Sequence, residues 1–292
     1  MRRLALLASL SAAVLLTVPA SAQTAPPADR YAVTVGGERA DLDAVVSAAL
    51  AADVVFLGER HDDAVAHALQ LQVLRAAYER AGRGDSGRPV ALGLEMFEAD
   101  VQPVVDEYLA GAIDERGFLD ASRPWPTYAT DYRSLVEYAR AHGLPVVATN
   151  APARHVRAVA RGGVEALDAL PAASLAVYPP RPWAAASPAL AAAFAEAMGG
   201  MAGHGGSALD GMLAAQNLRD LVMAWRTAQA LSDGALVVHV NGSFHSAGGL
   251  GIPEHLARFA PGARVLVVTF EPTDDLASPP TAGGVVVQTR AE

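Results

Sequence analysis

Short apolar runs that end abruptly in polar residues constrain this chain of 292 residues more than any other feature. The clearest run covers residues 54–57, Val-Val-Phe-Leu, and leads through Gly58 to Glu59 and His61. An uninterrupted run of this length is typical of a strand buried on both faces of a parallel sheet, and a glycine permits a sharp turn after it. We therefore expect Glu59 and His61 at the tip of a core strand.

The same pattern returns three times along the chain. The runs and the polar residues behind them are 90–94 with Glu95, 144–149 with Asn150, and 235–240 with His245 after Gly242. Helix-length segments separate the runs, which predicts parallel strands joined by right-handed crossovers. The strand tips should then converge at one edge of the sheet, where open α/β proteins bind ligands.

The remaining segments complete the predicted fold. We expect a hairpin strand at residues 31–35, a further strand at 265–270 and an edge strand at 285–288. Residues 171–211 are rich in Ala, Pro and Gly, which favours a small helical cap over sheet. The predicted fold is α/β, with a mostly parallel central sheet, helices on both faces and this cap, in one domain over residues 31–292.

The first 30 residues lie outside the predicted domain. Two Arg residues precede an apolar stretch, and small residues at 19–22 have the pattern of a secretory cleavage site. Residues 1–22 thus predict a removed signal peptide, with an uncleaved anchor as the alternative, and residues 23–30 predict a Pro-containing linker. We expect the mature chain to be periplasmic or secreted.

Two residue types are missing from the composition. The chain has no Cys, and all 22 of its basic residues are Arg. The missing thiol excludes disulfides, thiolate metal sites and a lipid-modified cysteine, and the missing Lys excludes a P-loop and a pyridoxal Schiff base. A formal net charge of −9 disfavours nucleic acid as a partner.

Two imidazoles and two carboxylates at the strand tips suit two kinds of chemistry, with Glu59, His61, Glu95 and His245 as the candidate catalytic residues. In one, His61, Glu95 and His245 hold a divalent metal whose bound water attacks a peptide or ester. The other is metal-free, with His61 or Glu59 as the general base that activates water. A third interpretation is structural, with each side chain bonded to loop backbone, but burying several polar groups in one cleft is costly unless they are used.

The ordered motifs resemble a known family. In chain order they are Gly58-Glu59-Arg60-His61, Gly93-Leu94-Glu95-Met96-Phe97, Pro145-Val146-Val147-Ala148-Thr149-Asn150, Gln216-Asn217-Leu218-Arg219-Asp220 and Gly242-Ser243-Phe244-His245. This set is similar to the ChaN family of haem-binding proteins in the Tiki and TraB superfamily, which also resembles the erythromycin esterases. The resemblance spans residues 54–271.

The resemblance implies haem binding in haem and iron uptake at the bacterial envelope, with a second copy of the chain and an outer-membrane haem receptor as partners. It equally implies a latent hydrolase site at the strand tips. The family's motif residues fall on the four candidates named above, with Arg219 and Asp220 on a late helix as candidate cofactor-binding residues. The lipoprotein members differ from this chain, which has no cysteine to acylate.

Haem needs an apolar slot, an axial ligand and a cation for its propionates. Without Cys, the ligand must be Tyr, His or Met. Tyr178, Met201 and His204 lie in the segment best able to form the slot, with a surface Tyr and a gap-filling Met as the alternative. Among the other histidines, we expect His239, inside an apolar strand, to be a core residue. We expect the four on predicted helices to be exposed: His67, His142, His155 and His255.

Overall fold

The computed structural model describes residues 25–83, 87–199, 206–231 and 234–290. The predicted signal peptide, Met201 and His204 lie outside these ranges. Within them, no helix combines the length and the apolar character needed to cross a bilayer.

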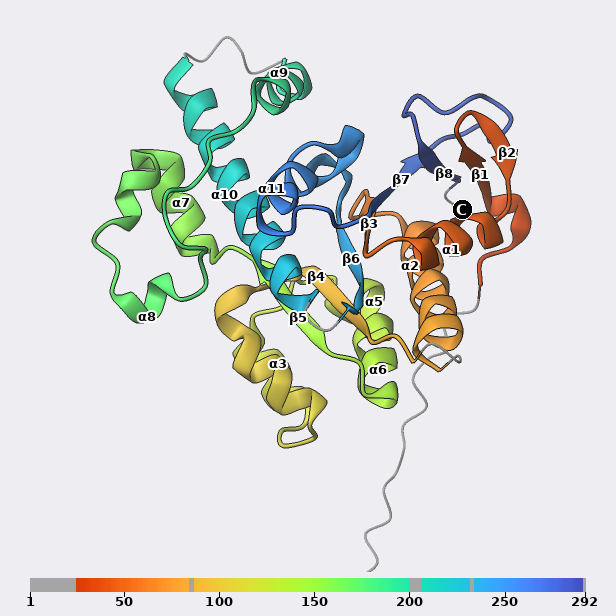
Figure 1. Cartoon of the computed structure of the whole chain (residues 1–292), viewed down its shortest axis with the longest axis horizontal. Helices are drawn as coiled ribbons and strands as arrows, with labels where there is room; N and C mark the ends of the chain where they lie inside the picture. Colours follow the sequence, from red (N-terminus) through yellow and green to blue (C-terminus); the bar gives the residue numbers. More distant parts are fainter. Residues whose placement is uncertain (1–24, 84–86, 200–205, 232–233, 291–292) are drawn as a thin grey trace, which may run out of the picture.

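One eight-stranded sheet forms the centre of the molecule (Figure 1). Its strands, in spatial order, are β2 (Glu38–Ala40), β1 (Tyr31–Val35), β8 (Val285–Thr289), β7 (Val265–Pro272), β3 (Val54–Glu59), β6 (Leu236–Gly242), β4 (Val90–Glu98) and β5 (Val146–Asn150). The strands from β8 to β5 are parallel, and β1 is antiparallel to both its neighbours. The predicted mostly parallel sheet is confirmed. The predicted edge position of β8 is wrong, because the β1–β2 hairpin adds to the sheet beyond it.

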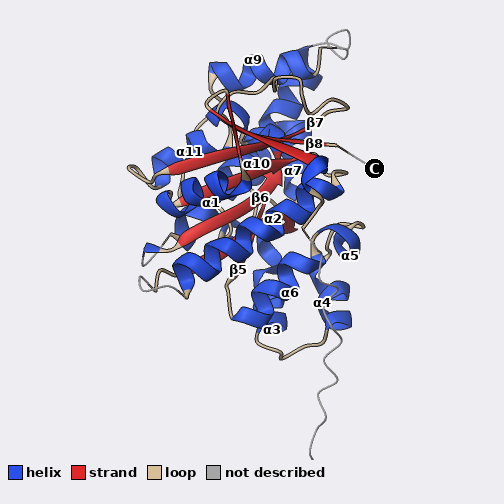
Figure 2. Cartoon of the chain, turned by 90° about the vertical axis from the view of Figure 1, so that its right-hand side faces the viewer, coloured by secondary structure: helices blue, strands red, loops and turns tan. Residues whose placement is uncertain are grey.

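Helices cover both faces of this sheet (Figure 2). They are α1 (Leu42–Ala51), α2 (Ala64–Ala77), α3 (Gln102–Leu109), α4 (Glu115–Ser122), α5 (Tyr128–Asp131), α6 (Arg133–His142), α7 (Ala153–Gly162), α8 (Ala172–Leu175), α9 (Pro188–Ala197), α10 (Gly206–Ala230) and α11 (Ile252–Phe259). Because side chains alternate along a strand, Val55 and Leu57 of β3 pack in a core with α1, α2 and α6. Val54 and Phe56 point the other way, into a core with α10 and α11.

The segment predicted as a cap contains α8 and α9, and α10 begins within it at Gly206. A separate apolar cluster joins this segment to α7 and α10 through Tyr178, Val156 and Leu218. In Figure 1, α8 and the β1–β2 hairpin lie at opposite ends of the molecule, and α9 lies at the top between them.

A side chain covers the outer edge of β5. Gln102 Nε2 donates to the Val146 carbonyl at 2.8 Å, and the Ala148 amide donates to Gln102 Oε1 at 2.8 Å. The glutamine amide thus takes the hydrogen bonds that another strand would take. The opposite edge is the three-residue strand β2, whose residues are all exposed.

Candidate functional site

The strands that carry the predicted site are longer than the sequence indicates. Glu59 is the last residue of β3, and Glu95 lies inside β4. The predicted sharp turn at Gly58 is wrong. Gly58 continues β3 and pairs with Asn241 of β6. Its small size serves close packing, because a Cβ at Gly58 would lie 3.0 Å from Ser243 Cα.

Glu59 is buried, with 2% of its surface exposed. Its Oε1 accepts a hydrogen bond from the Tyr132 hydroxyl at 2.6 Å and lies 3.0 Å from His61 Nδ1, and its Oε2 accepts from Gln70 Nε2 at 2.6 Å. His67 Nε2 also lies 3.2 Å from Oε2, but off the hydrogen-bond direction. Burial acts to raise the pKa of Glu59, but the contacts with His61, His67 and Tyr132 hold that pKa below its ordinary value.

The His61 side chain is 46% exposed and held on three sides. Glu59 contacts Nδ1, the ring of Trp125 packs edge-on at 4.7 Å, and Gly242 lies against the other end of the imidazole. A Cβ at Gly242 would lie 2.8 Å from Cε1 and 2.9 Å from Nε2 of His61, so only glycine leaves room for the ring. The hydrogen bond with Glu59 is the main cause that raises the pKa of His61.

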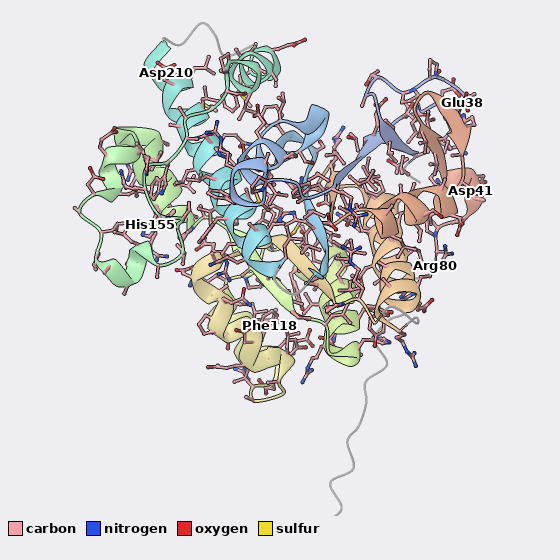
Figure 3. All side chains as sticks on the ribbon, in the orientation of Figure 1. Glu38, Asp41, Arg80, Phe118, His155 and Asp210 are labelled. Atoms are coloured by element: carbon pink, nitrogen blue, oxygen red, sulfur yellow. The ribbon has the colours of Figure 1, made fainter. Side chains whose placement is uncertain are left out.

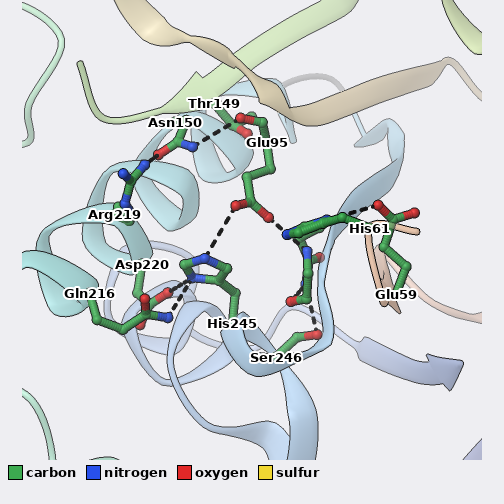
Figure 4. A network of polar contacts seen from close by, with 12 residues as sticks. Glu59, His61, Glu95, Thr149, Asn150, Gln216, Arg219, Asp220, His245 and Ser246 are labelled. Atoms are coloured by element: carbon green, nitrogen blue, oxygen red, sulfur yellow. Dashed lines mark hydrogen bonds and ion pairs between the residues drawn. The ribbon is translucent and has the colours of Figure 1, made fainter. Parts of the chain in front are cut away.

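His245 lies between two buried carboxylates (Figure 4). Its Nδ1 is 2.5 Å from Asp220 Oδ1, and its Nε2 is 3.3 Å from Glu95 Oε1. The other Glu95 oxygen accepts from the Gly242 amide at 2.7 Å. Burial opposes charge on all three side chains, but Glu95 and Asp220 raise the pKa of His245 to about 10, and the His245 charge is the main cause that lowers the pKa of Glu95 to about 2.

The tip of β5 joins the same network (Figure 4). Asn150 donates to the Glu95 carbonyl at 3.0 Å and accepts from Arg219 Nη1 at 3.0 Å. Arg219 and Asp220, which the resemblance places on a late helix, therefore both face the strand tips from α10. Gln216, one turn before Asp220, places its amide 2.8 Å from His245 Nδ1.

A cleft of about 460 Å³ opens over these tips. It is lined by Glu59, Arg60, His61, Asp62, Gly242, Ser243, Phe244 and His245. The two Gly-x-x-His motifs, far apart in sequence, thus form one cleft with Glu95 beneath it.

The predicted metal ligands do not present a set of free donor atoms. Both ring nitrogens of His245 face carboxylates, and the oxygens of Glu95 contact His245 and Gly242. Across the described ranges, no group of three or more His, Asp or Glu side chains is arranged to hold a metal ion. The divalent metal at His61, Glu95 and His245 stays a prediction, and the contacts in the structure do not favour it.

Three histidines predicted to be exposed are buried: His67, His155 and His255. Their respective partners are Glu59, Tyr178 and Asn217. These partners lie on other elements, so the helical spacing of the histidines does not indicate them. His142 is exposed as predicted. The prediction for His239 is confirmed, because it is fully buried and bonds to Thr149 and Asn241.

A second candidate region surrounds Trp183, a residue that no sequence motif singles out. This side chain lines three neighbouring hollows of about 310, 370 and 310 Å³. The first is mostly apolar and is lined by residues of α7 and α10, among them Asp210, which Figure 3 labels. Tyr178 and Arg181 line the second and Arg258 the third.

Tyr178 is buried in this region instead of ending a surface loop. Its hydroxyl lies 2.7 Å from His155 Nδ1, and its ring packs on Trp183 at 5.1 Å. Burial raises the pKa of Tyr178 and lowers that of His155, so both are neutral at pH 7.

Comparison with known proteins decides the family. The family model described as haem-binding uptake, Tiki superfamily, ChaN, matches residues 45–256. The chain belongs to this family.

One solved structure agrees with the ChaN fold. The structure that describes cofacial haem binding to ChaN of Campylobacter jejuni has a TM-score of 0.69 at 16% identity, and covers 90% of this chain and 98% of that one. An erythromycin esterase in its open conformation has a TM-score of 0.43 at 15% identity, with 89% of this chain and 82% of that chain covered.

A curated relative, the chloroplastic protein RETICULATA-RELATED 5 of Arabidopsis thaliana, is 29% identical over 125 residues. The match takes in 41% of this ChaN-family chain but spans only 16% of the plant protein's length.

Proposed function

We propose that this chain binds haem, or a related iron porphyrin, in haem and iron uptake. Membership of a haem-binding uptake family supports the ligand class. The observation that carries the location is the set of hollows around Trp183, because they combine apolar walls with a tyrosine and two arginines. These are the parts that a haem site needs.

In this proposal the Tyr178 hydroxyl would hold the haem iron. A phenol binds ferric iron as the phenolate, so it must give up its proton, and the neutral imidazole of His155 at 2.7 Å is placed to accept it. Arg181 and Arg258 lie at the exposed side of the hollows, where propionates would meet solvent. Met201 and His204 stay alternative ligands.

A hemin titration of the mature protein tests this proposal. We expect a saturable Soret shift at micromolar protein, lost or moved in Tyr178→Phe and retained in the matched variant Tyr138→Phe, which changes a half-buried tyrosine on α6. An unshifted Soret band in the unmodified protein would remove the haem proposal. Unchanged spectra in Tyr178→Phe would clear this residue as the ligand and direct attention to His204→Ala.

The cellular setting is part of the same proposal. We propose a periplasmic or secreted protein that forms a homodimer around haem and exchanges it with an outer-membrane haem receptor. The pattern of residues 1–22 supports secretion, and the cofacial haem binding described for ChaN of Campylobacter jejuni supports a shared site. Fractionation of cells and sedimentation with and without hemin test the two parts separately.

A second function is favoured by the half-exposed His61 in the cleft. We propose a hydrolase, a peptidase or esterase, in which His61 activates water against a carbonyl group. Both the metal-dependent and the metal-free hydrolase would use the side chains at these strand tips. The metal-free one is favoured, because the polar atoms of His245 and Glu95 already contact other groups of the protein. Turnover of p-nitrophenyl acetate should fall to background in His61→Ala and persist in His142→Ala, which removes an exposed imidazole elsewhere. Metal analysis of the purified protein distinguishes the two forms.

A further inference from the structure

Side chains of the protein interior already contact both carboxylate oxygens of Glu59. An ionised carboxylate only accepts hydrogen bonds. Tyr132 and His61 occupy Oε1, and Gln70 occupies Oε2 with His67 beside it. Since the side chain is also buried, neither oxygen is free to take a proton from a molecule in the cleft.

His245 and Glu95 are engaged in the same way. The two ring nitrogens of His245 face Asp220 and Glu95, which leaves no lone pair for a base or a ligand. One oxygen of Glu95 receives the Gly242 amide and the other contacts His245.

His61 differs from these three residues. Its Nδ1 contacts Glu59, whereas Nε2 has no hydrogen-bond partner among the residues that the structure describes. A carboxylate that accepts from one ring nitrogen fixes the proton on that nitrogen and leaves the lone pair on the other.

We propose that Nε2 of His61 is the reactive atom of the strand tips, and that Glu59 is a positioning residue that keeps the proton of this ring on Nδ1. Hydrogen bonds from Tyr132 and Gln70 hold Glu59 in turn. The inference deepens the hydrolase proposed above. Water bonds to the carbonyl carbon, its O–H bond breaks as Nε2 takes the proton, and that proton passes to the leaving alkoxide or amine when the old bond breaks.

Nitrogen NMR reads this arrangement directly in the protein without ligand. In protein labelled with ¹⁵N-histidine, at a pH where the His61 ring is neutral, long-range ¹H–¹⁵N spectra should show a protonated Nδ1 and an unprotonated Nε2. Glu59→Gln should shift the ring toward the opposite tautomer, and Glu95→Gln should not. A proton on Nε2 in the unmodified protein, or an equal shift in both variants, would overturn the proposal.

Chemical modification gives a second measurement that needs no variant. Diethyl pyrocarbonate bonds to an unprotonated imidazole nitrogen and releases ethyl carbonate. In the folded protein His61 should be labelled at least tenfold faster than His245, with the exposed His142 as the internal standard. Faster labelling of His245 than of His61 would overturn the proposal. Neither measurement uses haem or an ester, so its failure is separate from failure of the proposed functions.

Discussion

The strand tips and the Trp183 region are built in opposite ways. At the tips, polar side chains on β3, β4, β5 and α10 and in the turn after β6 are bonded to one another, and one methyl group at Gly242 would displace His61. Around Trp183, helices and an irregular segment leave three hollows with mostly apolar walls. The tips therefore resist change because their polar groups depend on one another, whereas the hollows have room for a ligand or for additional side-chain atoms.

The largest effect should come from breaking the buried ion pairs. Asp220→Ala leaves His245 with one carboxylate instead of two, and removing one partner of a buried pair costs about 3–5 kcal/mol. Urea denaturation should show this loss in the free energy of unfolding. Arg181→Ala, which breaks the exposed ion pair with Asp168 beside the hollows, should cost under about 1 kcal/mol. Equal losses for the two variants would contradict the contrast between the regions.

The pH dependence of stability should report the strand tips. The pKa of His245 rises from 6.5 to about 10 on folding, so its contribution is complete below pH 6.5 and is lost as the pH rises toward 10. The pKa of Glu95 falls from 4.5 to about 2, so its contribution is complete above pH 4.5 and is lost as the pH falls toward 2.

Denaturation curves between pH 6.5 and 10 measure the contribution of His245 to stability. We expect the free energy of unfolding to fall across this range, and His245→Asn to flatten the fall. Tyr178→Phe, near Trp183, serves as the matched variant and should leave the slope as it is. A slope that survives His245→Asn would place its origin elsewhere in the chain.

A single methyl group added at the strand tips should lower both stability and hydrolysis by more than its size indicates. Gly242→Ala places a carbon 2.8 Å from the His61 ring, so the ring must move, and overpacking of this kind costs about 1–3 kcal/mol. Hydrolysis of p-nitrophenyl acetate should fall at least tenfold, while the hemin Soret shift should persist. Full turnover in Gly242→Ala would show that the ring position is not needed.

The smallest effect on stability should come from filling a hollow. Ala214→Leu adds three carbons where Ala214 lines the cavity of about 310 Å³. Because there is room, we expect a change of less than about 1 kcal/mol in the free energy of unfolding. Hemin affinity should nevertheless fall about tenfold, since the added atoms occupy the space of the ligand. Unchanged affinity would move the haem site away from this cavity.

Features set by local pattern were predictable from the sequence. The runs that lead to Glu59 and Glu95 identify buried strands, and parallel strands bring their ends together. The edge position of β8 was wrong because it depends on where the distant β1 adds to the sheet. The burial of His67 was not predictable, because it depends on a contact with Glu59 on another element. The hollows at Trp183 depend on how helices and an irregular segment pack, and no sequence motif indicates that packing.

The Gln102 amide on β5 has a consequence for assembly. Many chains recruit copies of themselves by adding strand to strand, and a long open edge is the template for such growth. Here one edge is occupied from within by a side chain, and the other ends in the short charged strand β2. Among the described residues, neither edge of the sheet thus offers a long free strand, and we expect any contact between copies of this chain to form through helices and loops.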